Sequence, residues 1–491
     1  MSFTPNDGST ASSIHLVLRS LLQHDSLPFV DALTSEHIQE AFDAEGVSFG
    51  NPDSEPPTES IDDGGIVYTM GVTLWAMLSQ ALFTDVQRSC RAAVQRVAVY
   101  YALSGGDVSS TNTGAYCRAR AKIPEGVVQR LAEGVAERCE ALIPAEELWM
   151  GFRTRVVDGT TFSMPDTKTN QAEYPQSSSQ APGLGFPVLR GVALTSLATA
   201  MVVALAVGPC VGKETGETAL LRTLFDKLGP GDLVLSDRLY CGWFMLALMQ
   251  ERGVEFVTRL HQLRTADFSQ GKRLGREDHI VTWDKPAKPE WLDQETYDRL
   301  PDQLTVREVN IRINVPGCRT ASLVVVTSLL DHKRFPRDEI AALYRRRWGI
   351  ELELRDIKVT MRLDVLRRKT PAAVRQELWT GILTYNLIRQ SMLQSARVGE
   401  CRPDQLSFAS ALQLMANTWV LAAVPPIAAV SDRERLIALR ILNGHCHRVG
   451  NRPDRVEPRA VKRRAKPIAW LKELRESARA KLVNGSRTQS S

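Results

Sequence analysis

The eight cysteines of this 491-residue chain show no pairing pattern. They are Cys90, Cys117, Cys139, Cys210, Cys241, Cys318, Cys401 and Cys446, without a Cys-x-x-Cys pair. This scatter excludes a disulfide framework and, together with the absence of a secretory leader, predicts a cytoplasmic protein whose cysteines are small core residues. The triplet His445-Cys446-His447 has no partner cluster at metal-ligand spacing, so we expect a structural or surface role for it.

The chain also lacks a convincing membrane span. Residues 191–208 contain no charged side chain over 18 positions, which is the lower limit for a transmembrane helix. However, Thr195, Ser196 and Thr199 interrupt the stretch, and it has no aromatic and basic flanks. Two adjacent core strands, at about 188–196 and 200–207, explain the composition better, and we expect a soluble protein.

A strong net charge is missing too, because the formal value is only +5. Its distribution is uneven: residues 1–65 carry 12 acidic side chains against the single Arg19, whereas residues 448–491 carry 13 basic and 4 acidic ones. The run Lys462-Arg-Arg-Ala-Lys466 in this basic tail suits phosphate binding, although such runs are often only solvated.

The most informative feature that is present is a helical face. Tyr344, Arg347, Glu351 and Lys358 are spaced so that, at about 100° per residue, they fall within an arc of roughly 60°. A compact apolar stripe lies beside it, formed by Leu343, Ile350, Leu354, Ile357 and Met361. One face of this helix can therefore pack while its neighbour lines a cleft. The alternative is a solvated face with helix-spaced ion pairs.

Two aspartates follow apolar runs that read as strands. Arg153-Thr-Arg-Val-Val-Asp158 reads as a strand ending at Asp158, and the next residue is a glycine, where the backbone turns or another group approaches closely. Leu233-Val-Leu reads as a short buried strand, and Asp237 follows it. In open α/β sheets, sites gather at the carboxyl ends of strands. An aspartate of this kind taken alone is more often a turn or cap residue than a site residue.

Taken together, these motifs are similar to those of a known family. Asp158-Gly-Thr, Asp237-Arg and Tyr344-x2-Arg347-x3-Glu351-x6-Lys358 resemble the DDE-type transposases of bacterial insertion sequences, in the insertion-sequence-four-type branch with the Y-R-E-K signature. Met164-Pro-Asp-Thr, Tyr174-Pro-Gln and Gly231-Asp-Leu-Val-Leu-Ser-Asp-Arg238 also look like that family. The resemblance spans about residues 70–470.

The resemblance implies an RNase H-like catalytic core in which Asp158, Asp237 and Glu351 are the catalytic residues and hold two Mg²⁺ or Mn²⁺ ions. Simple electrostatics is consistent with this, because three converging carboxylates repel one another unless cations neutralise them. Two ions can activate water or a 3′-hydroxyl and stabilise the leaving oxygen of an in-line displacement. The implied reaction is nicking at the ends of a mobile element and transfer of the freed 3′-hydroxyl to target DNA.

The remaining signature residues are expected to contact double-stranded DNA. Arg347 and Lys358 are assigned to phosphates near the scissile end, and Tyr344 to a phosphate hydrogen bond or base stacking. Arg238 could add charge toward the substrate, or form a salt bridge to a loop. Relatives of this type can stack a flipped base on an aromatic side chain; Trp283 and Trp291 are candidates by region. Pairing of two identical ends implies a homodimeric complex.

The expected architecture is an α/β fold with an RNase H-like mixed sheet flanked by helices, a β-rich insertion, and a helical N-terminal domain. We expect an acidic segment at 1–70, with helices at 13–23 and 35–44 and a Pro/Ser/Asp-rich linker at 51–65. A helical DNA-end-binding domain follows at 71–150, with its strong helices at 73–103 and 125–142. The catalytic domain covers 151–400, with a strand at 255–259 and a helix that starts near Pro336; the 114 positions from Asp237 to Glu351 are too many for one strand and one helix and imply the insertion at about 262–332. A helical region with a basic tail covers 401–491. Arg118, Arg120 and Lys122 are the DNA contacts expected in the first helical domain, which could also be an ordinary bundle.

Two other functions remain open at this point. A metal-dependent nuclease that does not transpose would keep the same three acids but would not need ordered contacts to the ends of an element. A catalytically inactive relative that binds DNA as an inhibitor would have lost at least one acid, and this chain retains Asp158, Asp237 and Glu351. End-specific cleavage and strand joining would separate these functions.

Overall fold

The computed structural model describes residues 33–49, 67–103, 112–178, 181, 183–312, 322–347 and 349–421, with a few positions between 473 and 481. The predicted helix at 13–23, the linker at 51–65, the triplet at 445–447 and the basic run at 462–466 lie outside the described residues. Among the residues that are described, no helix is long and apolar enough to cross a membrane.

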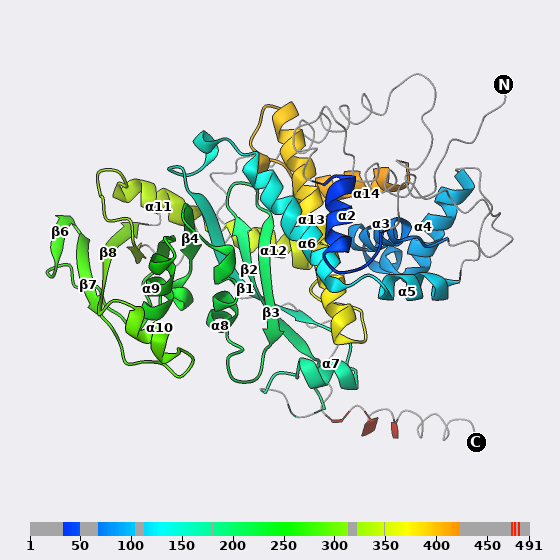
Figure 1. Ribbon diagram of the computed structural model, residues 1–491, viewed down its shortest axis with the longest axis horizontal. Coiled ribbons are helices and arrows are strands. Elements are labelled where there is room, and N and C mark those ends of the chain that lie inside the picture. Colours follow the sequence, from blue (N-terminus) through cyan, green and yellow to red (C-terminus); the bar gives the residue numbers. More distant parts are fainter. Residues whose placement is uncertain are drawn as a thin grey trace.

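A nine-stranded mixed sheet forms the centre of the described structure, with the order β3-β2-β1-β4-β5-β9-β8-β7-β6 (Figure 1). Pairs β1–β4 and β4–β5 are parallel, and the others are antiparallel. The half β3-β2-β1-β4-β5 is the RNase H-like mixed sheet, so the expected fold class is confirmed. The strands are β1 (Arg153–Ser163), β2 (Val188–Ser196), β3 (Val202–Pro209), β4 (Asp232–Ser236), β5 (Glu255–Arg259), β6 (Lys272–Gly275), β7 (Asp278–Asp284), β8 (Gln303–Arg312) and β9 (Ser322–Thr327).

The uncharged stretch at 191–208 belongs to the antiparallel pair β2 and β3, as predicted. Their side chains are buried on both faces, which explains why the run does not alternate with polar residues. The β-rich insertion is confirmed in composition but extends the catalytic sheet itself, because β9 pairs with β5 and leads on to β8, β7 and β6. With the short helix α10 (Gln294–Arg299), these strands occupy the left end of Figure 1.

Alternation along the central strands assigns their side chains to two cores. Val156, Leu233 and Leu235 belong to a core shared with the long C-terminal helices. Val157 and Val234 belong to the core on the opposite face, beneath α8 (Glu217–Arg222) and α9 (Trp243–Glu251). The period of two in a strand produces this division. The helices in the first core include α6 (Glu125–Ala141), α11 (Arg337–Arg346), α12 (Gly349–Arg355) and α13 (Pro371–Val398).

The helical N-terminal region packs beside α13, toward the right of Figure 1. A single helix was expected from Thr73 to Leu103, and this was wrong: the chain forms α3 (Met70–Leu82), a 3₁₀ turn (Asp85–Arg88) and α4 (Cys90–Leu103). Phe83 and Thr84 are extended and Asp85 has a φ of 51°, which breaks the helix and lets α4 fold back along α3. The other helices here are α2 (Ser35–Asp43), α5 (Thr113–Ala121) and α14 (Phe408–Leu421).

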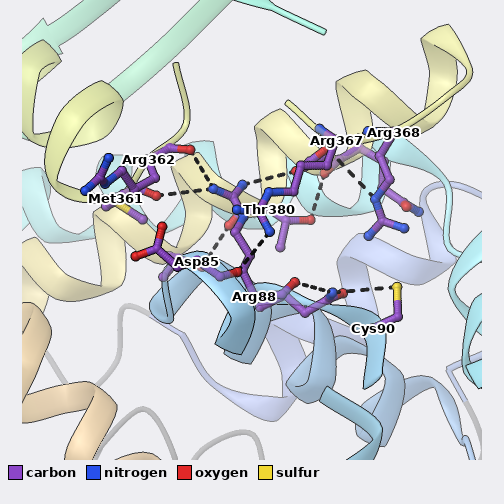
Figure 2. A network of polar contacts seen from close by, with 12 residues as sticks. Asp85, Arg88, Cys90, Met361, Arg362, Arg367, Arg368 and Thr380 are labelled. Atoms are coloured by element: carbon purple, nitrogen blue, oxygen red, sulfur yellow. Dashed lines mark hydrogen bonds and ion pairs between the residues drawn. The ribbon is translucent and has the colours of Figure 1, made fainter. Parts of the chain in front are cut away.

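A buried arginine fastens this helical region to the catalytic domain (Figure 2). Arg88 donates to the carbonyl oxygens of Met361 and Arg362, at 3.2 and 2.8 Å, and pairs with the Glu377 carboxylate on α13 at 3.1 Å. Glu377 also accepts the backbone N–H groups of Arg367 and Arg368. The 3₁₀ turn between α3 and α4 is thereby attached to the segment that follows Lys358.

Candidate active site

Asp158 and Asp237 occupy equivalent places on two adjacent parallel strands. The last pair of the ladder between β1 and β4 is Val156 with Leu235, and Asp158 and Asp237 each follow their member of that pair by two residues. By alternation, both side chains belong to the sheet face that α11 and α12 cover. The two predicted strand-end carboxylates are therefore brought to one edge of the parallel ladder.

Asp158 is not the last residue of its strand, contrary to the prediction. β1 continues to Ser163 because it remains paired with β2, where Asp158 lies opposite Ala193. What ends near Asp158 is the pairing with β4, since β4 stops at Ser236. Asp158 thus lies where two neighbouring strands separate, which is the physical equivalent of a strand end.

Asp237 directly follows β4, as predicted. Its carboxylate accepts the backbone N–H of Leu239 at 2.8 Å and so caps the 3₁₀ turn Arg238–Tyr240. Its carbonyl accepts the Thr258 hydroxyl from β5 at 2.8 Å. Arg238 is exposed. The cap reading considered for Asp237 is therefore correct, and it is compatible with a site because the carboxylate keeps a second oxygen for another partner.

The pKa shifts of Asp158 and Tyr344 show which charged groups lie near the two aspartates. Burial raises the pKa of Asp158 to about 6, against the opposing effects of the Gly159 N–H and of Arg347; Asp237 and Glu217 raise it further. Burial likewise raises the pKa of Tyr344 to about 12, with Arg347 acting to lower it and Asp237 to raise it. Arg347 is thus close enough to interact with the charge of Asp158, and Tyr344 with that of Asp237.

The signature segment is not one regular helix. α11 begins after Pro336, as predicted, and ends at Arg346; Arg347 keeps helical angles, α12 covers Gly349–Arg355, and a π-helical turn covers Asp356–Thr360. The wheel drawn at about 100° per residue therefore does not hold as far as Lys358. Glu351 lies on α12, and its side chain, like the whole of Trp348, falls outside the described residues.

The packing side of the segment agrees with the prediction, since all five members of the apolar stripe are buried. On the other side, the Arg347 guanidinium lies 5.7 Å from the centre of the Tyr344 ring. The Lys358 ammonium lies 5.8 Å from the centre of the Phe162 ring on β1, and burial lowers the Lys358 pKa. Lys358 thus faces the strand that carries Asp158.

The basic residues predicted in the helical region divide into two groups. Arg118 and Lys122 are exposed, at the end of α5. The Arg120 guanidinium instead turns into the helical region, where it contacts the Cys90 sulfur at 3.3 Å and lies 5.2 Å from the centre of the Tyr116 ring. Arg118 and Lys122 are therefore the two of the three whose side chains are exposed.

Trp283, on β7, and Trp291, just before α10, each have an arginine guanidinium over the ring. Trp283 is buried, donates its indole N–H to Glu308 at 3.0 Å and lies beneath Arg264, 4.0 Å from the ring centre. Trp291 is half-buried beneath Arg222, at 3.9 Å. Trp283 therefore has a structural role in this arrangement.

Two residues near the aspartates were missed by the sequence reading. Glu217, the first residue of α8, places its carboxylate against Gly159, where an added Cβ would overlap it. Tyr240 is buried and donates its hydroxyl to Glu217 at 3.1 Å. In the sequence, only Gly159 pointed to these residues: it predicted that some group approaches the backbone closely, but not which group.

The carboxylates near this place are of the chemical type that binds hard divalent cations. Asp158, Asp237 and Glu217 offer only carboxylate oxygens, the ligands that Mg²⁺ and Mn²⁺ prefer. Among the residues that the structure describes, no group of three or more His, Cys, Asp or Glu side chains is arranged to hold a metal ion. The side chain of Glu351, the third predicted ligand, is outside that set.

The sheet order and the two aspartates beside the end of the β1–β4 ladder agree with the RNase H-like core that the sequence motifs imply. Residues 149–387, just under half of the chain, match the transposase DDE domain family, and this match supports the resemblance to the DDE transposases of the insertion-sequence-four type. It is 27% identical over 353 residues to the transposase InsG for insertion sequence element IS4 of Escherichia coli strain K12, an alignment that covers 71% of this chain and 76% of the relative.

Among solved structures, the chain is similar to the piggyBac transposase in a cryo-EM synaptic complex with hairpin DNA. The similarity has a TM-score of 0.40 and 9% sequence identity, and it covers 88% of this chain and 85% of the other.

Proposed function

We propose that this protein is a cut-and-paste DNA transposase that hydrolyses phosphodiester bonds at the ends of its own element and joins the freed 3′-hydroxyls to target DNA, with divalent metal ions as cofactor. The observation that carries the proposal is the shared register of Asp158 and Asp237 on β1 and β4, on the face covered by the helices that bear Tyr344, Arg347 and Glu351.

In this proposal Asp158, Asp237 and Glu351 hold two Mg²⁺ or Mn²⁺ ions. When bound, such ions activate an attacking water or hydroxyl and stabilise the leaving oxygen. The raised pKa of Asp158 supports the assignment, because burial beside Asp237 disfavours its charged form until a cation compensates. The protein supplies the position and charge of these oxygens, and no side-chain nucleophile is required.

The cationic side chains of the same segment are assigned to the DNA backbone. Arg347 lies near Asp158 and is held against Tyr344, so its guanidinium can orient a phosphate beside the carboxylates. Lys358, facing β1, is assigned to a neighbouring phosphate. Arg238, Arg118 and Lys122 are exposed and extend the contacts to flanking DNA, whereas Arg120 serves packing. Two protomers would bring two ends together as a homodimer.

The experiment requires the ends of the element, which are the short inverted repeats expected on either side of the coding region. A labelled end is incubated with full-length protein and Mg²⁺, and nicking, joining and end binding are measured separately. We expect Glu351→Gln to abolish nicking while end binding remains within about twofold, because one carboxylate of the metal site is lost and the cationic contacts are kept. Glu339→Gln, an exposed acid on α11, is the matched control and should cut normally.

The outcomes separate the alternative functions. Cleavage of any DNA without preference for the ends identifies a nuclease that does not transpose. End binding without cleavage by the unaltered protein identifies an inactive, inhibitory relative. Full cleavage by Glu351→Gln would contradict the role assigned to that residue.

A further inference from the structure

Glu217 reaches the proposed site from the opposite layer of the molecule. It is the first residue of α8, whose Leu220 and Leu221 pack in the core on the far side of the sheet from α11 and α12. Its carboxylate nevertheless lies against the backbone of Gly159, the residue after Asp158. This approach is possible because position 159 has no side chain and because β1 has already left its pairing with β4.

Tyr240 determines where the Glu217 carboxylate points. The Tyr240 ring is 1% exposed and its hydroxyl donates to Glu217 at 3.1 Å, so the donor cannot turn away to solvent. Tyr240 ends the 3₁₀ turn that Asp237 caps, which ties the orientation of Glu217 to the strand end bearing the second aspartate. Asp158 and Asp237 are also close enough for their charges to act on Tyr240, so its hydroxyl interacts with three carboxylates.

We propose that Glu217 is a further positioning residue of the catalytic site: it holds the water shell of the divalent cation beside Asp158, and Tyr240 orients its carboxylate for that purpose. This inference rests on the proposed function. An indirect contact is favoured because the described carboxylates do not form a ready-made group of three direct ligands. Hydrogen bonds from metal-bound water to an outer carboxylate are a common way of fixing such ions.

The competing explanation is purely structural. An acidic residue in the first turn of a helix interacts favourably with the helix dipole, and Glu217 occupies that position on α8. This explanation does not account for the close approach to Gly159 or for the buried hydroxyl that fixes the carboxylate. It also makes a different prediction, because dipole stabilisation affects folding of the metal-free protein and leaves cation binding unchanged.

The test measures Mn²⁺ binding to the full-length protein without DNA, by calorimetry, beside the melting temperature of the metal-free protein. Glu217→Gln keeps the volume and the Tyr240 hydrogen bond but removes the charge, and should weaken Mn²⁺ binding at least fivefold without lowering the metal-free melting temperature. Gly159→Ala leaves every charge in place but displaces the carboxylate, and should weaken Mn²⁺ binding similarly. Glu214→Gln removes an exposed acid three residues away and should bind Mn²⁺ normally.

Asp237→Asn makes failure of this inference distinguishable from failure of the proposed function. If Asp237→Asn loses Mn²⁺ binding while Glu217→Gln and Gly159→Ala keep it, the inference about Glu217 is overturned and the metal site stands. A lower metal-free melting temperature with unchanged Mn²⁺ binding in Glu217→Gln would assign Glu217 to the helix dipole alone. If Asp237→Asn binds Mn²⁺ like the unaltered protein, the proposed metal site itself is contradicted.

Discussion

The position of the Asp158 side chain lowers the stability of the metal-free fold at neutral pH. Its partner across the antiparallel ladder is Ala193 on β2, the charge of Asp237 after β4 acts on it, and burial opposes its ionisation. The N–H of Gly159 and the charge of Arg347 offset this only in part, because the pKa is still raised to about 6. A group held this way in a metal-free protein destabilises it at neutral pH, which is expected of residues selected to bind a cation.

This cost predicts a specific pH dependence. Folded Asp158 binds a proton more tightly than the unfolded chain does, so its unfavourable contribution develops as the pH rises from about 4 to 6 and is complete above 6. Asp158→Asn should therefore raise the metal-free unfolding free energy at pH 7.5 by about 1–2 kcal/mol, after a discount for partial exposure, and by almost nothing at pH 4. Thermal unfolding at both pH values is the measurement.

The exposed Asp226→Asn serves as the control for that measurement, and its melting temperature should follow the unaltered protein at both pH values. An Asp158→Asn variant that is less stable than the unaltered protein at pH 7.5 would show that the carboxylate stabilises the metal-free fold.

The residue scale also shows what sequence reasoning could reach at the site. Asp158 and Asp237 could be found because each follows an apolar run, and their shared face follows from strand periodicity. Gly159 predicted a close approach, but the approaching Glu217 lies 58 positions further along the chain, where only the folded sheet brings it near. Tyr240 could not be found for the same reason. Its role depends on burial, which sequence spacing near Asp237 does not indicate.

At the scale of elements, most strands and helices followed from their hydrophobic patterns, and β5 was predicted with its observed bounds. The errors are breaks inside long apolar patterns. The predicted helix from Thr73 to Leu103 divides at Phe83, and the signature helix divides near Arg347 and passes into a π-helical turn at Asp356. Such breaks depend on tertiary contacts, because local propensity on either side still favours helix.

The contacts of Arg88 with Met361, Arg362 and Glu377 are the clearest of these tertiary contacts. Arg88→Ala should lower the unfolding free energy by about 2–4 kcal/mol, because the buried Glu377 carboxylate keeps only the longer ion pair to Arg368, at 3.9 Å, and the carbonyls of Met361 and Arg362 lose their donor. Denaturant unfolding measures the loss. Arg91→Ala, an exposed arginine on α4, should change stability by no more than about 0.5 kcal/mol. Equal losses of unfolding free energy in the two variants would contradict the stabilising role assigned to the buried contacts of Arg88.

At the scale of the whole molecule, the insertion and the catalytic half form one continuous sheet. The long gap between Asp237 and Glu351 predicted inserted strands, but it could not predict that β9 would pair with β5 and carry them onto the same sheet. This topology returns the chain through β9 to α11 alongside the catalytic strands, since α11 contacts both β5 and β8. A residue distant in sequence from the aspartates, Glu351, is thereby carried on a helix over the same face.

The most direct test of the central claim is a crystal structure of the full chain soaked in Mn²⁺, with anomalous diffraction locating the metal. We expect anomalous peaks within bonding distance of carboxylate oxygens of Asp158 and Asp237, with the Glu351 side chain turned toward the same peaks. Absence of a peak beside the two aspartates at saturating Mn²⁺, or a Glu351 carboxylate directed away from an occupied site, would contradict it.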